Sequence, residues 1–77
     1  MNFTGTISKR TETDFGTVTV TDETNCFMAK VFVDNVELIR FPIVKSADLN
    51  EINLRICNVV YQTGFIDGPA KVTLNPV

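Results

Sequence analysis

Apolar and polar residues alternate one by one along much of this chain, most clearly in the segment DFGTVTVTDE, residues 14–23. A period of two is typical of a β-strand that turns one face to the core and the other to water. Residues 15–22 are therefore predicted to form a strand with valine on its buried face. Three threonines would line the outer face, namely Thr17, Thr19 and Thr21. Because the β-branched threonine side chain fits the pleat of an exposed strand, we expect these hydroxyls to meet solvent rather than a ligand.

Three other segments alternate in the same way and are predicted to be strands: residues 3–10, 26–34 and 70–76. Their inward-facing residues are predicted to be Phe3, Gly5, Ile7, Phe27, Ala29, Val31, Val33, Val72 and Leu74. Polar or glycine-containing turns separate the strands at residues 11–14, 22–25 and 63–69.

The remaining apolar segments alternate less regularly. Residues 37–44, ELIRFPIV, are predicted to be an edge strand or the start of a new segment, because Pro42 has no backbone N–H to donate to a ladder. Residues 46–53 allow at most one or two helical turns, with Ser46 as the N-cap residue. Residues 53–62, NLRICNVVYQ, are predicted to be a further strand.

Five or so short strands separated by turns favour an all-β fold, a small closed barrel in which no strand edge stays exposed. The chain of 77 residues is long enough for a single domain, residues 1–77. No apolar run approaches the roughly 18 residues of a membrane helix, and residues 1–10 lack the hydrophobic stretch of a signal peptide. We therefore expect a cytoplasmic protein with no membrane partner.

Charge and side-chain chemistry narrow the possible functions. Seven Lys and Arg against nine Asp and Glu give a net charge of −2, so nucleic acid could not be held by overall charge alone. With no histidine and only Cys26 and Cys57, the chain lacks the usual ligand set for zinc. Both thiols are expected to be free and buried, with a disulfide between them as the alternative. The sequence contains no glycine-rich loop of the kind that binds phosphate. Acidic residues that neighbour each other occur at predicted turns, where carboxylates are usually solvated, so they do not indicate a catalytic pair. We expect no metal, no cofactor and no enzymatic activity.

The order of short motifs resembles that of the bacterial cold-shock domain over roughly the whole chain, with an insertion around residues 36–55. The matching motifs are GTI at 5–7, FGTV at 15–18, VFVD at 31–34 and GPAKVTL at 68–74. The resemblance implies a five-stranded OB-like barrel. It also implies that outward aromatic rings on the second and third strands stack on unpaired bases.

Carried over residue by residue, the resemblance assigns Phe15 and Phe32 to the stacking platform. If alternation holds, both rings point outward, and the nearby cations Lys9, Arg10 and Lys30 give a basic and aromatic surface. Other positions depart from the family pattern: its second strand phenylalanine falls on Thr17, its histidine on Asp34, and its tryptophan on or near Lys9.

Two functions follow from these observations. The first is single-stranded nucleic-acid binding, of RNA or DNA, by Phe15, Phe32, Lys9, Arg10 and Lys30. The second is a protein-interaction module, such as an accessory or inhibitor protein of a mobile element, on a barrel that has lost its base platform. The aromatic pair favours the first function, whereas the net charge, Thr17 and Asp34 favour the second.

Overall fold

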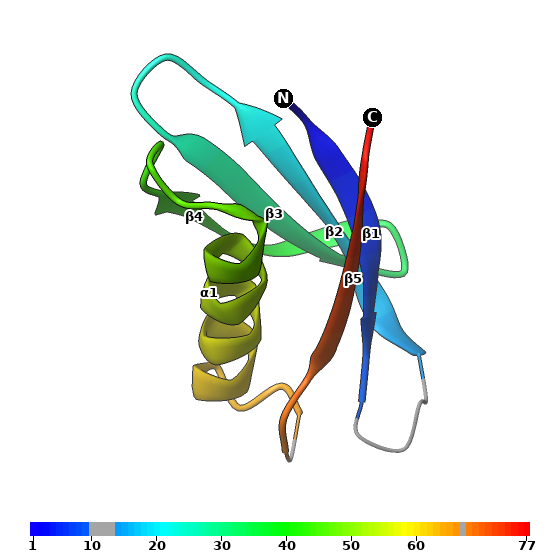
Figure 1. The fold of residues 1–77 in the computed structure, drawn as a ribbon. Coiled ribbons are helices and arrows are strands. Elements are labelled where there is room, and N and C mark those ends of the chain that lie inside the picture. Colours follow the sequence, from blue (N-terminus) through cyan, green and yellow to red (C-terminus); the bar gives the residue numbers. More distant parts are fainter. Residues whose placement is uncertain (10–13, 67) are drawn as a thin grey trace.

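A computed structural model describes residues 1–9, 14–66 and 68–77 of the chain. Five strands and one helix follow one another: β1 (Phe3–Ser8), β2 (Asp14–Asp22), β3 (Phe27–Val33), β4 (Val36–Ile43), α1 (Leu49–Gln62) and β5 (Lys71–Pro76). The strands form one antiparallel sheet in the order β4-β3-β2-β1-β5, with the first four in a meander (Figure 1). The expectation of a mostly β fold is confirmed, and Pro42 lies in an edge strand as predicted.

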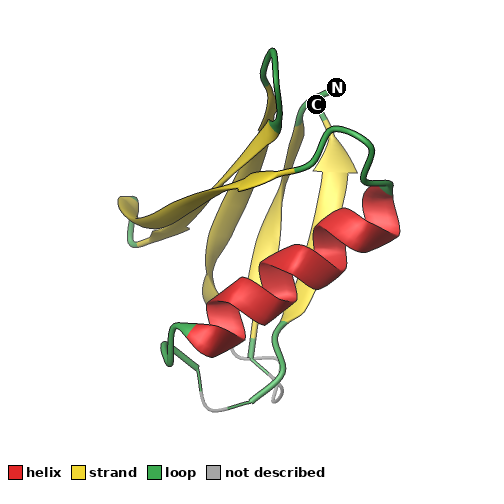
Figure 2. Cartoon of the chain, turned by 90° about the vertical axis from the view of Figure 1, so that its left-hand side faces the viewer, coloured by secondary structure: helices red, strands yellow, loops and turns green. Residues whose placement is uncertain are grey.

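The sheet is open. No pairing joins β4 to β5 within the described residues, so both strands remain edges. Helix α1 lies across one face of the strongly twisted sheet (Figure 2) and contacts β5. Closure into a barrel was expected because it would remove the exposed edges. Here α1 instead covers the apolar face of the sheet, and the edges stay unpaired.

The core lies between α1 and the inward face of the sheet. Val18, Val20 and Val31 are fully buried there, as the alternation predicts. Other strand residues of the core are Phe3, Ile7, Ala29, Phe41, Ile43 and Leu74. At the centre of β1, Gly5 lets β5 approach closely, because a Cβ there would lie 1.9 Å from the Thr73 carbonyl oxygen.

Residues 53–62 are helical, and the predicted strand there is wrong. The helix is also longer than the one or two turns expected at residues 46–53. Ile52, Ile56 and Val60 are buried at intervals of four residues, which is the spacing of a single helix face. The segment contains Ile56, Val59 and Val60 among its apolar residues, and a short apolar run of this kind is compatible with a strand as well as with a helix.

The helix begins two residues later than expected. Asp48, rather than Ser46, is the N-cap residue, and its Oδ1 accepts a hydrogen bond from the Glu51 amide at 2.9 Å. At the other end, the Thr63 amide donates to the Val59 carbonyl at 3.1 Å, and Gly64 follows with a φ of 78°. A glycine with positive φ ends a helix without the steric cost that a Cβ would bring.

Candidate nucleic-acid interface

The face of the sheet that points away from α1 is called the outer face here. Strand register aligns its residues in two rows that cross the strands. One row is Thr73, Thr6, Thr17 and Phe32, from β5 to β3. The next row is Asn75, Thr4, Thr19, Lys30 and Arg40, from β5 to β4. The outer face therefore joins a hydroxyl-rich half on β5, β1 and β2 to a basic and aromatic half on β3 and β4.

Two cations face each other on the basic half. Lys30 and Arg40 are register partners on β3 and β4. Arg40 donates from Nε and Nη2 to the two carboxylate oxygens of Glu37, each at 2.9 Å, and these bonds raise the pKa of Arg40. Lys30 forms no hydrogen bond or ion pair with any described residue. Like charges directly opposite each other destabilise a sheet, and here the Glu37 carboxylate offsets the charge of Arg40.

The threonine hydroxyls beside these cations are unengaged. Among the described residues, none of the outer-face threonines of the two rows donates or accepts a side-chain hydrogen bond within the protein. Thr17 lies directly across from Phe32, and Thr19 directly across from Lys30. A ligand at the two β3 residues would therefore meet free hydroxyls on the neighbouring strand.

Phe32 lies on the outer face, as the alternation predicts, and is half-buried. Phe15 does not follow the prediction. Ile7 pairs with Gly16 and Ser8 with Asp14, so Phe15 is an extra residue at a bulge between β1 and β2. Its ring packs against the core cluster and stacks on Phe65, with centroids 6.5 Å apart and planes at 27°.

The structure therefore brings together only part of the predicted site. Lys30 and Phe32 lie close together on β3, whereas Lys9 is exposed just beyond the end of β1. Arg10 lies outside the described residues. Asp34, which the resemblance to the cold-shock pattern aligns with a histidine, has a φ of 52° in the turn between β3 and β4.

Arg40 belongs to the basic half of the outer face but was not among the predicted site residues. It lies within the predicted edge strand 37–44, but the alternation there gave no register with β3. The register shifts between Val31 and Phe32, so that Lys30 opposes Arg40 whereas Phe32 opposes Glu37. This irregularity arises from the pairing of two strands, so the sequence pattern of one strand alone does not predict it.

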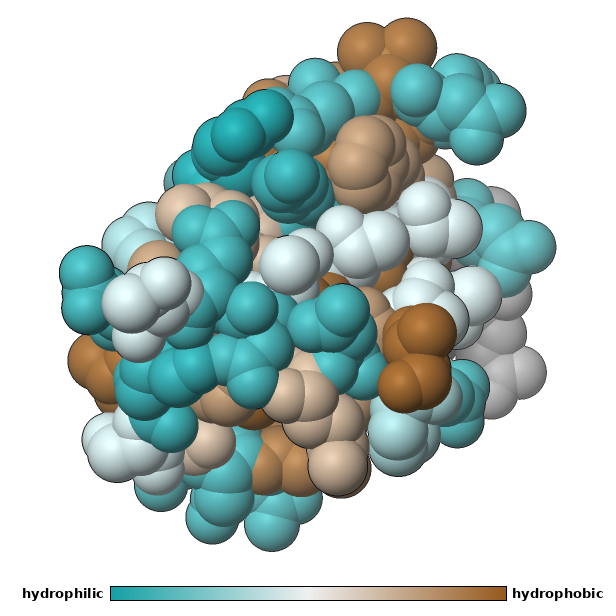
Figure 3. Space-filling view, turned by 90° about the horizontal axis from the view of Figure 1, so that it is seen from above, coloured by the Kyte–Doolittle hydropathy of each residue, from teal (hydrophilic) through white to brown (hydrophobic). Residues whose placement is uncertain are grey.

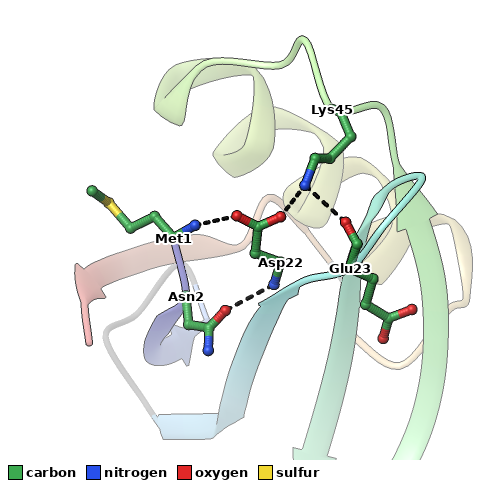
Figure 4. A network of polar contacts seen from close by, with 5 residues as sticks. All are labelled: Met1, Asn2, Asp22, Glu23 and Lys45. Atoms are coloured by element: carbon green, nitrogen blue, oxygen red, sulfur yellow. Dashed lines mark hydrogen bonds and ion pairs between the residues drawn. The ribbon is translucent and has the colours of Figure 1, made fainter.

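Another cation, Lys45, forms hydrogen bonds in a polar network apart from the two rows of the outer face. Its Nζ donates to the Asp22 carboxylate and, at 2.8 Å, to the Glu23 carbonyl oxygen (Figure 4). The Met1 amino group donates to the other Asp22 oxygen, and the Asp22 amide donates to Asn2 Oδ1 at 2.8 Å. The hydrogen bond from Lys45, followed by the one from the amino terminus, lowers the pKa of Asp22.

The end of the molecule seen from above is mainly hydrophilic, and its apolar side chains are scattered among polar ones (Figure 3). No continuous apolar surface is visible from this direction. The described part of the chain contains no helix long and apolar enough to cross a membrane.

Both cysteines are free thiols, as predicted, but they are half-buried rather than fully buried. Cys57 Sγ lies 3.4 Å from the Ala70 carbonyl oxygen, to which its thiol donates. Burial raises the pKa of Cys57, which makes the reactive thiolate scarcer at neutral pH.

Comparison with protein-family models, with curated proteins and with solved structures gave no match for this chain.

Proposed function

We propose that this protein binds single-stranded nucleic acid on the outer face of its sheet. The observation that carries the proposal is the pairing of two cations, Lys30 and Arg40, next to the ring of Phe32. Cations bind phosphate, and an aromatic ring stacks on an unpaired base whatever the base is. A duplex keeps its bases stacked inside, so it would offer Phe32 nothing to stack on.

Each group on the basic half has a distinct part in this proposal. Lys30, which has no partner among the described residues, contacts a phosphate as a point charge. Arg40 keeps donors free beyond the two that Glu37 uses, so it can hold its carboxylate and contact phosphate together. Phe32 stacks on one base. With a single ring and a net charge of −2, binding is expected to be weak and local.

The resemblance to cold-shock domains adds support, because its motifs fall on β1, β2, β3 and the segment leading into β5. In that family the outward residues of the second and third strands contact the bases. We propose a distant relationship to the OB-like barrel of that family, with α1 in place of the pairing that would close the sheet. A cytoplasmic location is part of the same proposal and fits the two free thiols.

Fluorescence anisotropy with labelled eight-nucleotide single strands tests this function. Phe32→Ala is expected to weaken binding by about 1–3 kcal/mol. Lys30→Ala should also weaken binding, and should lower the slope of log affinity against log salt by about one, because one phosphate contact is lost.

Two controls match these changes away from the outer face. Lys45→Ala removes the same charge at the Asp22 network, and Tyr61→Ala removes an exposed ring from α1. Both should leave binding within about twofold of the parent protein, because surface changes far from a ligand alter it little. Equal losses from Lys30→Ala and Lys45→Ala would mean that only net charge matters, and the proposed site would be wrong.

A protein-interaction module is the second candidate, and α1 supports it. Leu54 and Tyr61 are exposed on the same side of the helix as Asn50 and Asn58, so this stripe carries no charge. Interface centres are depleted of charged residues and enriched in tyrosine. The second candidate predicts that the parent protein binds no oligonucleotide even at low salt, so the same titration separates the two functions.

A further inference from the structure

We infer that the outer face prefers RNA to DNA, because free threonine hydroxyls lie where the sugar of a bound strand would rest. This inference depends on the proposed function and names the kind of nucleic acid. Only two threonines, Thr17 and Thr19, are needed for it, and it revises the expectation from the sequence that their hydroxyls meet solvent. They are the direct register partners of Phe32 and Lys30.

The placement of the sugar follows from the two anchors. A nucleotide whose base stacks on Phe32 and whose phosphate contacts Lys30 has its sugar between these groups. Adjacent strands are about 4.8 Å apart, so side chains of β2 and β3 that oppose each other lie within reach of one nucleotide. If the bound nucleic acid extends from these anchors toward β1, its sugar edge lies over Thr17 and Thr19. If it extends toward β4, its sugar edge lies over Glu37 and Arg40.

The chemistry on the two sides favours the threonine side. Glu37 is an anion that would repel the phosphate chain, whereas β2, β1 and β5 continue with neutral threonine or asparagine in both rows. A nucleic acid bound at Lys30 and Phe32 is therefore expected to continue toward β1. It passes over the hydroxyls of Thr17 and Thr19 directly after the anchors.

A ribose can form hydrogen bonds with these threonine hydroxyls, whereas a deoxyribose cannot. The 2′-hydroxyl both donates and accepts hydrogen bonds, as threonine does. Neither threonine has to break a bond within the described protein to reach it. Deoxyribose presents only C–H groups at that position, so a threonine hydroxyl covered by DNA would lose its water without gaining a partner.

The test compares eight-nucleotide oligouridine with oligodeoxyuridine of the same length and label, at one salt concentration. The parent protein is expected to bind the RNA about 2- to 10-fold more tightly, which is the effect of one net hydrogen bond. The double variant Thr17→Val, Thr19→Val should bind RNA and DNA equally, by losing RNA affinity alone. Valine keeps the β-branched shape, so the strand should persist, and circular dichroism with thermal melting checks that it does.

Two further measurements sharpen the test. Thr24→Val, in the turn between β2 and β3, removes a hydroxyl far from Lys30 and Phe32 and should keep the RNA preference. Because the threonine contacts are neutral, the double variant should keep the salt dependence of the parent protein, unlike Lys30→Ala.

The failures of the two proposals are distinguishable. Equal binding of RNA and DNA by the parent overturns the RNA preference and leaves the proposed function intact. Equal losses for RNA and DNA in the double variant do the same, because the hydroxyls would then contact phosphate or base. Binding of neither oligonucleotide overturns both.

Discussion

At the residue scale, Phe15 and Phe32 differ because of one extra residue in β2. Without a bulge, alternation places both rings on the outer face. The bulge instead turns Phe15 toward the core and onto Phe65, and leaves Phe32 across from Thr17. A β-bulge commonly redirects a side chain in this way. The ring that packs on the core and the ring that lies on the outer face are therefore different residues.

This difference predicts how the two rings respond to truncation. Phe15→Ala should lower the free energy of unfolding by about 1–3 kcal/mol, less than the 3–5 kcal/mol of a fully buried phenylalanine. Phe32→Ala should lower it by less than about 1 kcal/mol, because Phe32 does not pack against the core. Urea denaturation measures both values. A larger loss for Phe32→Ala would place that ring in the core and remove it from the proposed site.

At the scale of elements, α1 is held by one apolar stripe. Ile56 has no exposed surface, whereas Leu54, two residues earlier, is 62% exposed. The stripe packs on the inward face of the sheet and the opposite side of the helix faces solvent. Most of the stability of such a helix comes from this packing rather than from the propensity of its residues.

Truncation of these two residues tests the helical assignment of residues 53–62. Ile56→Ala should cost about 2–5 kcal/mol of unfolding free energy through the cavity it leaves. Leu54→Ala should change stability by no more than about 0.5 kcal/mol, because the side chain is in water. If the segment were a strand, Leu54 and Ile56 would lie on the same face and their truncations would have similar costs. Thermal melting followed by circular dichroism separates these outcomes.

At the scale of the whole molecule, the Asp22 network joins three segments that are distant in sequence. The Asp22 carboxylate at the end of β2 binds the Met1 amino group before β1 and Lys45 between β4 and α1 (Figure 4). Its pKa is lower in the folded protein, chiefly through the hydrogen bond from Lys45. The charged carboxylate therefore favours the folded state.

The lowered pKa predicts a pH dependence of stability. Asp22 contributes fully above its unfolded pKa, near 3.8, and its contribution disappears as the pH falls through the lower folded pKa. Asp22→Asn should therefore be less stable than the parent at pH 6, and the difference should shrink below about pH 4. Because the pair is exposed, added salt should also reduce the difference. Urea denaturation at several pH values measures it, and a constant difference down to pH 2 would contradict the role of the charge.

Much of the sheet was predictable from the sequence, because its pattern is local. Val18, Val20 and Val31 are buried where alternation places them, and Pro42 lies in an edge strand. Side chains on a strand alternate between faces whatever the rest of the chain does, so an unbroken run of alternation is enough. For the same reason Lys30 and Phe32 were correctly placed on one face.

Tertiary structure alone decided the features that depend on two or more segments. Bulges set the direction of Phe15 and the pairing of Lys30 with Arg40, and each exists only between two paired strands. The short apolar segment of residues 53–62 is compatible with a strand or a helix by composition. The apolar face of the sheet decided the outcome, because a helix placed across it buries Ile52, Ile56 and Val60 together.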